Sequence, residues 1–468
     1  MSEHARLKMN VEPFYRQLSK RASVVFVALL FSGCSLLAIL IPPFQSPDEF
    51  EHITRAYLLG RGDIVLGAPA GQPTGGQIDT GLIRYMESFA GLPFHPDKKL
   101  TRSGVEATKQ IEWTGELAFR PALGMAYYFP GIYALHALGL KTGETLNLSV
   151  DTSYRMTRTI LLIACCVILY YAFLLYQPPL LVLGLLVMPM TLFQFSSASL
   201  DGIATALGIF VISAFFSLIG SQNKSKNLLF VLLIGAWLLI ASSRLQLFPM
   251  ILLPLIAGLV LRRHWYVISA CVAALSVIAW QILMMRTVVD GRVALGASTG
   301  EIAAYYLQSP MNLVNVLVMT LSDEVQMRGY FSSFFGMLGW LDTPFVGKEY
   351  TYLFSLTMLI FLTTVAYRSL LRDKLIRVSL VTCAIGSLAI IFFAMLISWT
   401  PHPATVIEGV QGRYFLIPAI MLAYALCHTL REQRGARALV ALSLTVILGL
   451  YSFINTGLLL LARYQFGS

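Results

Sequence analysis

Residues 24–52 read VVFVALLFSGCSLLAILIPPFQSPDEFEH, an apolar run followed closely by four ionisable side chains within five positions. About 20 apolar residues suffice for a helix to cross the hydrocarbon core, since each adds about 1.5 Å. The run from Val24 to Ile41 is therefore expected to span the membrane. Because it follows a polar head, residues 1–21, and lacks a small-residue cleavage site, we expect a permanent anchor. The acidic cluster then lies where this span leaves the membrane.

The composition places the whole chain in the membrane. Of its 468 residues, 57% are hydrophobic and 12% are charged, which is far from the values of soluble domains. The net charge of +10 is spread over short connections between apolar runs, so we expect membrane lipid and no nucleic acid as partner. No Walker loop, dinucleotide fingerprint, His-Glu-x-x-His or Gly-x-Ser-x-Gly motif occurs, which argues against ATP-driven transport and proteolysis.

Further apolar runs follow the first one. They cover residues 156–176, 179–198, 202–220, 227–242, 246–261, 265–285, 351–371, 377–398, 414–430 and 438–461. Together with the first run they predict an all-α polytopic membrane fold with about eleven transmembrane helices. One more segment, Pro121 to Leu140, is apolar but interrupted by Pro130, and it could either cross the membrane or lie along it.

The positions of Lys and Arg favour the second arrangement, because cytoplasmic connections are enriched in both. If Pro121 to Leu140 does not cross, the basic N-terminal head and the clusters at 224–226, 262–263, 368–377 and 431–437 all fall on the cytoplasmic side. We therefore expect a cytoplasmic N-terminus and a large first extracytoplasmic loop with juxtamembrane helices. The expected parts are a cytoplasmic segment (1–21), a transmembrane module (22–285) that includes the first loop (43–153), an extracytoplasmic loop (286–350) and C-terminal transmembrane helices (351–468).

The strongest chemical candidates follow the first span. Asp48 and Glu49 are adjacent acids at a low-dielectric boundary, where nearby cations can hold them ionised for service as a base or a metal ligand. The alternative is that they only form the first turn of a helix that starts at Pro47. With Glu51 and His52 they would suit a divalent cation without requiring one, so we expect no cofactor and assign no metal site.

Other candidates fall on the same side of the membrane. Arg55, Arg244 and Arg413 could bind a donor phosphate through their guanidinium groups, although arginines at span ends also serve as interfacial anchors. The side chains suited to contacts with a sugar or an acceptor are Glu51, His52, Asp201, Trp340, Asp342, Gln411 and Tyr414. Aromatic residues are expected at membrane interfaces in any case, so Trp340 and Tyr414 carry less weight.

Four segments give the sequence a resemblance to a known class. Asp48-Glu49-Phe50 resembles the modified Asp-x-Asp motif that GT-C glycosyltransferases carry in the first extracytoplasmic loop. More specifically, the chain resembles a bacterial family of predicted membrane proteins of unassigned function within that superfamily. The segments that carry the likeness are PDEFEHITRAY (47–57), residues 188–201, GWLDT (339–343) and GVQGRYF (409–415). The acidic pair alone is a weak signal, whereas the four together are specific.

The resemblance implies an inverting transferase that takes a sugar from a polyprenyl-phosphate donor on the outer face of the bacterial inner membrane. The acceptor would be a lipopolysaccharide, a teichoic acid, another envelope glycan or a protein. Asp48 would be the catalytic base, with Glu49 as its neighbour and possible substitute. Arg244 departs from the lysine that relatives often carry there. Two other classes stay open, a glycan polymerase or ligase and a lipid or polysaccharide transporter.

Overall fold

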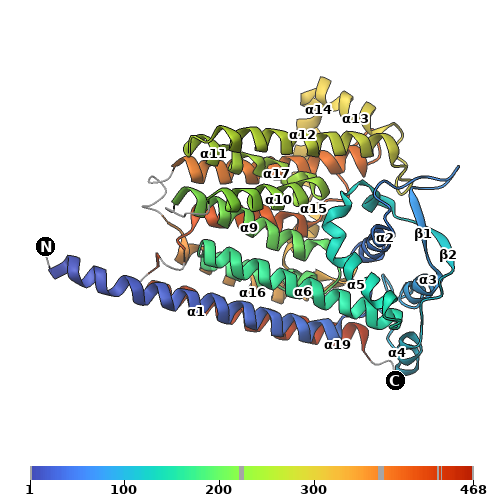
Figure 1. The fold of residues 1–468 in the computed structure, drawn as a ribbon, viewed down its shortest axis with the longest axis horizontal. Coiled ribbons are helices and arrows are strands. Elements are labelled where there is room, and N and C mark those ends of the chain that lie inside the picture. Colours follow the sequence, from blue (N-terminus) through green and yellow to red (C-terminus); the bar gives the residue numbers. More distant parts are fainter. Residues whose placement is uncertain (1–2, 221–225, 367–373, 430–431, 434, 466–468) are drawn as a thin grey trace.

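The computed structural model describes residues 3–220, 226–366, 374–429, 432–433 and 435–465. Outside the described residues lie parts of two predicted spans, 351–371 and 414–430, and parts of three predicted basic clusters, 224–226, 368–377 and 431–437. Most of the long helices lie side by side in one bundle (Figure 1). Within the described residues, seven helices are long and apolar enough to cross a membrane. They are α1 (Glu3–Leu40, of which Arg21–Leu40 is the apolar part), α6 (Val150–Leu175), α9 (Leu200–Gly220), α10 (Lys226–Ser243), α12 (His264–Thr287), α17 (Lys374–Ser398) and α19 (Gly435–Tyr464).

The other four predicted spans form shorter or less apolar helices. They are the pair α7 (Leu180–Leu186) and α8 (Pro189–Phe195), the pair η3 (Leu245–Ile251) and α11 (Leu252–Val260), the single helix α16 (Gly347–Thr364), and the pair η4 (Gly412–Phe415) and α18 (Leu416–Leu426). The first pair is interrupted just before Pro189, because proline disfavours the helical conformation in the residue that precedes it. The helical, membrane-embedded character is thus confirmed, and the number of eleven spans stays a prediction.

Residues 42–149, which we call the cap, gather at the end of the bundle that is far from the N-terminus (Figure 1). Its elements are α2 (Glu49–Gly60), β1 (Gly75–Asp79), α3 (Thr80–Glu87), α4 (Arg102–Lys109), β2 (Leu117–Pro121), η1 (Leu123–Tyr127), η2 (Pro130–Tyr133) and α5 (Ala134–Thr145). Strands β1 and β2 pair antiparallel, with Gly75 opposite Pro121 and Asp79 opposite Leu117. The cap shares one continuous apolar core with the bundle.

The doubtful segment from Pro121 to Leu140 does not form a long helix. It contains η1, η2 and the first half of α5. The whole of α5 has 12 residues and is about 18 Å long, whereas the hydrocarbon core of a bilayer is about 30 Å thick. Helix α5 packs against α2 and α6. The segment is therefore built into the cap, and the topology of the chain stays a prediction.

The end of α19 fastens the cap to the bundle. Leu100 N donates to the carbonyl of Tyr464 at 2.9 Å, and Lys99 Nζ donates to the carbonyl of Ala462 at 2.6 Å. A lysine at this position also complements the negative end of the helix dipole. Arg463 reaches back to the carbonyl of Leu92 at 2.6 Å. These contacts hold the cap in a fixed position relative to the last helix.

The segment 286–350, expected as a loop, contains regular structure. It forms α13 (Thr299–Gln308), α14 (Pro310–Ser322), α15 (Glu324–Phe335) and a short hairpin of β3 (Met337–Leu338) and β4 (Thr343–Pro344). Helix α14 is apolar but has only 13 residues, too few to cross a membrane alone. Helix α15 packs against η4 and thereby adjoins Arg413.

Candidate functional site

Asp48 stands at the start of α2 in an unusual backbone conformation. Its φ of 63° and ψ of 8° lie in the left-handed region, and its side chain makes no capping hydrogen bond to the helix. Non-glycine residues in this region are uncommon, and they cluster at functional sites where the surrounding structure holds them. The carboxylate is instead directed at another side chain, since Asp48 Oδ2 accepts a hydrogen bond from Arg413 Nη2 at 2.8 Å.

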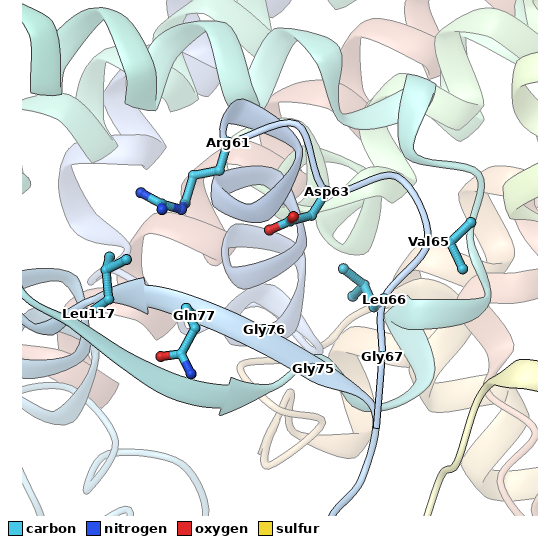
Figure 2. A pocket seen from close by; sticks show the side chains of 9 residues that line it. All are labelled: Arg61, Asp63, Val65, Leu66, Gly67, Gly75, Gly76, Gln77 and Leu117. Atoms are coloured by element: carbon cyan, nitrogen blue, oxygen red, sulfur yellow. The ribbon is translucent and has the colours of Figure 1, made fainter. Parts of the chain in front are cut away.

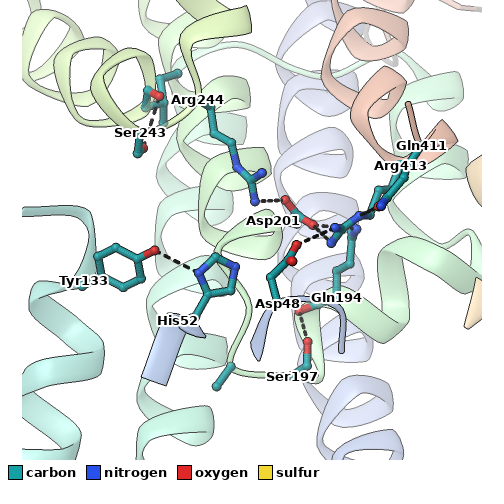
Figure 3. Close-up of polar contacts among 12 residues, drawn as sticks. Asp48, His52, Tyr133, Gln194, Ser197, Asp201, Ser243, Arg244, Gln411 and Arg413 are labelled. Atoms are coloured by element: carbon teal, nitrogen blue, oxygen red, sulfur yellow. Dashed lines mark hydrogen bonds and ion pairs between the residues drawn. The ribbon is translucent and has the colours of Figure 1, made fainter. Parts of the chain in front are cut away.

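Asp48 belongs to a chain of four alternating charges (Figure 3). Arg413 binds Asp48 with one terminal nitrogen and Asp201 with the other, at 2.8 Å in both cases. The second oxygen of Asp201 pairs with Arg244. We call these four residues the charge chain. Its members come from the start of α2, the first turn of α9, the residue after α10, and η4, so the fold assembles it from four distant parts of the sequence.

Two glutamine side chains fix the charge chain in place. Gln194 Nε2 donates to Asp201 Oδ2 at 3.1 Å, and Gln411 Oε1 accepts from Arg413 Nε at 2.6 Å. All three guanidinium nitrogens of Arg413 are thus bound, and its side chain is 1% exposed, against 28% for that of Asp48. Asp48 is therefore the member of the pair that incoming molecules can reach.

The environment sets the charge of the acids on α2. Burial alone would raise the pKa of Asp48, but Arg413 and then Arg244 oppose this, so its pKa lies below the usual value. Burial and the neighbouring Asp48 charge together raise the pKa of Glu51. Glu51 Oε2 is buried without a hydrogen-bond partner among the described residues. The carboxylates of Asp48 and Glu51 thus differ in basicity, because their environments differ.

His52 lies beside this cluster as a neutral group. Its ring is fully buried, which lowers its pKa to about 3, and Nδ1 shares a hydrogen bond of 2.9 Å with the Tyr133 hydroxyl. Nε2 is buried and has no hydrogen-bond partner in the part of the chain that the structure describes. Figure 3 shows the ring between Tyr133 and Asp48. His52 thus supplies an unsatisfied hydrogen-bonding atom next to the charge chain.

Glu49 has a different position from its neighbour. Its side chain is fully buried, and Oε1 accepts from the Tyr154 hydroxyl and from Ala198 N, both at 2.6 Å. Oε2 accepts from Ser46 N at 3.1 Å. These bonds tie the start of α2 to α6 and to the connection between α8 and α9. Glu49 therefore anchors the loop that presents Asp48.

The side chain of Arg55 also has a structural role. Its side chain is fully buried, and its two terminal nitrogens donate to the carbonyls of Asp63 and Ile64 at 2.8 and 2.6 Å. It therefore stabilises the loop after α2 and is not among the residues gathered at Asp48.

Two more predicted residues lie on the β3–β4 hairpin. Trp340 Nε1 donates to the carbonyl of Phe44 at 2.9 Å, and its ring centroid is 5.8 Å from that of Phe50. Asp342 accepts from Phe94 N at 2.7 Å. These contacts join the hairpin to the cap. Trp340 reaches the Asp48 loop, whereas Asp342 serves the junction with residues 92–100.

Aromatic rings cover both arginines of the charge chain. The Tyr414 ring centroid is 5.3 Å from Arg413 Cζ, and that of Tyr128 is 5.6 Å from Arg244 Cζ. Both distances suit a cation–π interaction. Tyr414 was predicted at the site for sugar contact, and in the structure its ring lies on Arg413.

Several residues at the site were not singled out from the sequence. Tyr133 and Gln194 lie in apolar runs, where nothing but their polarity marks them. Arg120 and Arg292 contribute positive charge near Glu51. Both stand in segments that the sequence analysis expects as long loops, where an arginine is unremarkable. Among the described residues no group of three or more His, Cys, Asp and Glu side chains is arranged to hold a metal ion.

The geometry defines a class of protein, a polytopic membrane protein with a buried charge chain at one end of its apolar bundle. A family model described as "Predicted membrane protein (DUF2142)" matches residues 30–423. The chain belongs to this family, and the matched region includes the whole charge chain. No curated protein and no solved structure gives a significant match.

Proposed function

We propose that this protein is an inverting membrane glycosyltransferase. It would move a sugar from a polyprenyl-phosphate donor to an envelope glycan or lipid-linked acceptor, at the extracytoplasmic face of the bacterial inner membrane. The observation that carries the proposal is the charge chain: a strained, reachable aspartate joined to two buried arginines at the end of an apolar bundle. The resemblance of residues 48–50 to the GT-C acidic motif adds support.

The chemistry needs a base and a cationic site, and the charge chain has both. The acceptor hydroxyl would attack the anomeric carbon, its proton would pass to Asp48, and the bond from that carbon to the phosphate oxygen would break. Asp48 is suited to this step because Oδ2 is held by Arg413 while Oδ1 makes no hydrogen bond to the described residues. Arg244 and Arg413 would stabilise the charge that develops on the departing polyprenyl phosphate.

The distribution of charge favours a transferase over a transporter. Ionisable residues deep within spans usually mark transport pathways. In the seven apolar spans of the described residues, with Arg21–Leu40 taken as the apolar part of α1, every Asp, Glu, Lys and Arg stands within about three turns of a span end. The two acids of these spans, Asp151 and Asp201, both stand in the first turn of a helix on the side of the cap, as a reaction at that membrane surface requires. A glycan polymerase or ligase would use similar chemistry, so the product must distinguish it.

The first test compares envelope glycans from cells that lack the protein and carry either the intact chain or Asp48→Asn. Asparagine tolerates the left-handed backbone, so this change removes the base without forcing the loop to move. Asp97→Asn, an exposed acid in the cap, serves as the charge-matched control. We expect mass spectrometry to find one defined sugar missing, restored by the intact chain and by Asp97→Asn only.

Each other outcome has a meaning. Accumulation of unextended or unattached glycan would favour a polymerase or ligase. Full restoration by Asp48→Asn at matched abundance would remove Asp48 from the mechanism and favour transport.

A further inference from the structure

A second site lies at the other end of α2 from Asp48. There a cavity of about 350 Å³ opens between the loop after α2 and the β1–β2 ribbon. Figure 2 shows the side chains of Arg61 and Asp63 extending from that loop toward the space next to Leu117. The residue types and the way this loop is held indicate what the cavity binds.

The loop that forms one wall is held in a fixed shape. The buried guanidinium of Arg55 donates to the carbonyls of Asp63 and Ile64, and Asp63 N donates to the carbonyl of Leu58 at 3.0 Å. The sequence analysis marked Arg55 as a phosphate ligand, yet in the structure it shapes this wall. A preformed wall loses little conformational entropy when a ligand binds.

The ribbon that forms the opposite wall is equally constrained. A Cβ on Gly75 would lie 2.2 Å from the carbonyl oxygen of Arg120, and one on Gly76 would lie 2.5 Å from the Leu58 side chain. Glycine at both positions lets β1 lie tightly between β2 and α2. The backbone of Gly75 and Gly76 therefore remains open to the cavity.

The lining presents polar groups of both hydrogen-bonding kinds. Arg61 is a donor, Asp63 an acceptor and Gln77 both, and the side chains of Asp63 and Gln77 make no hydrogen bond to the described residues. Leu66 and Leu117 add apolar surface. Sugars fit such a mixture, because they offer hydroxyl groups that donate and accept as well as C–H faces. The carboxylate of Asp63 would repel a phosphate, and a lipid tail would leave these polar groups unpaired.

The cavity also has a useful position relative to Asp48. The two sites are separated by the 12 residues of α2, a length of about 18 Å. The ribbon connects them as well, since β2 carries Leu117 at the cavity and Arg120, whose guanidinium is 6.0 Å from the ring centroid of Phe50 beside the acids. A chain of several sugars is long enough to reach from one site to the other.

We propose that this cavity is a binding subsite for a neutral, hydroxyl-rich oligosaccharide, namely the part of the acceptor glycan that lies away from the reacting end. As an acceptor subsite it rests on the proposed transferase function. It makes the protein selective for acceptors that already carry several sugars, because a short acceptor cannot occupy Asp48 and the cavity together.

Two variants test the cavity without disturbing the charge chain. Gly67→Phe fills it, and the position tolerates a side chain because a Cβ there would meet nothing within 4 Å. Asp63→Ala removes the unpaired acceptor. The matched controls are Gly91→Phe and Asp97→Ala, at exposed cap positions outside the cavity.

The measurement is saturation-transfer NMR and titration on the full-length protein in nanodiscs. The probes are oligosaccharides of increasing length, released by mild acid from the envelope of the host strain. We expect the intact protein, Asp48→Asn and both controls to bind the longer oligosaccharides. We expect Asp63→Ala to bind them at least about tenfold more weakly, which corresponds to the loss of one hydrogen bond to a charged group, and Gly67→Phe to bind them at least as weakly because its ring occupies the cavity.

The subsite and the transferase function can fail separately, and the measurements distinguish the two failures. Unchanged binding by both cavity variants, or no binding of any oligosaccharide by the intact protein, would overturn the subsite. If Asp48→Asn restores the envelope glycans while the cavity variants still lose binding, the transferase mechanism fails and the glycan-binding cavity stands.

Discussion

Asp48 and Glu49 are adjacent acids with opposite expected phenotypes, which makes Glu49→Gln the most informative perturbation. Glu49 accepts three hydrogen bonds, from the Tyr154 hydroxyl, Ala198 N and Ser46 N. Glutamine keeps one acceptor oxygen and places an NH2 group where the other was. At least one of the three bonds is lost, and a hydrogen bond to a charged group contributes about 1.5–3 kcal/mol.

The expected loss is therefore at least about 1.5–3 kcal/mol in the free energy of unfolding, or roughly 10-fold to 150-fold in the unfolding equilibrium. Asp48→Asn should cost less, because its carboxylate is partly exposed and Arg413 keeps its bonds to Asp201 and Gln411. The assay is denaturant unfolding of the purified proteins in one detergent, followed by tryptophan fluorescence. Envelope glycans from complemented cells, normalised to protein abundance, give the activity.

Glu49→Gln should thus lower stability while each folded molecule stays active, whereas Asp48→Asn should keep most of the stability while each folded molecule is inactive. A Glu49→Gln protein as stable as the parent yet inactive would refute this reasoning, since it would make Glu49 the reacting acid. Tyr154→Phe provides a check, because it removes one donor to Glu49 without touching the charge. It should destabilise the protein and leave activity per folded molecule unchanged.

Three further predictions follow from the charges and the exposed surface. Arg413→Ala leaves two acids without their shared partner and should lower the free energy of unfolding by about 3–5 kcal/mol, measured by the same unfolding assay. Because the pKa of Asp48 is depressed, its ion pair stabilises the fold above the unfolded-state pKa of about 4 and ceases to do so as the pH falls further. An Asp48→Asn protein should lose stability less steeply below pH 4 than the parent, in parallel unfolding titrations. In α14, Met311 and Met319 are 69% and 59% exposed, so a fluorophore on Met319→Cys should be quenched by brominated lipid, whereas one on Asp97→Cys should not.

The sequence predicted the members of the charge chain better than their connections. Asp48, Asp201, Arg244 and Arg413 were found because these ionisable residues at span ends all fell on one side of the membrane. Asp48 and Arg413 are 365 positions apart, so their hydrogen bond could not be derived from any local pattern. One-sided clustering thus located the site, and only the folded chain shows which acid pairs with which cation.

The residues assigned differently by the structure share one property. Glu49 and Arg55 bind mainly backbone groups of other segments, such as Ala198 N and the carbonyl of Asp63. A sequence shows which side chains carry charge, but not which loop amides and carbonyls lack partners after folding. Buried charged groups must find such partners. Helix α14 was missed for another reason, since its 13 residues, although mostly apolar, fall below the length that marks a span.

If the proposed function holds, the charge balance of the site would couple donor binding to the activation of Asp48. With no donor bound, two arginines face two aspartates, and Arg413 keeps the carboxylate of Asp48 a weak base. A donor phosphate adds negative charge that the two arginines must share. As Arg413 turns part of its hydrogen bonding to the phosphate, Asp48 loses its counter-ion and gains a negative neighbour, and both changes raise its pKa. The acid limb of kcat, which reports the donor complex, should then lie at higher pH than that of kcat/KM, which reports the free enzyme. Asp48 would become an effective base for the acceptor hydroxyl only after the donor has arrived.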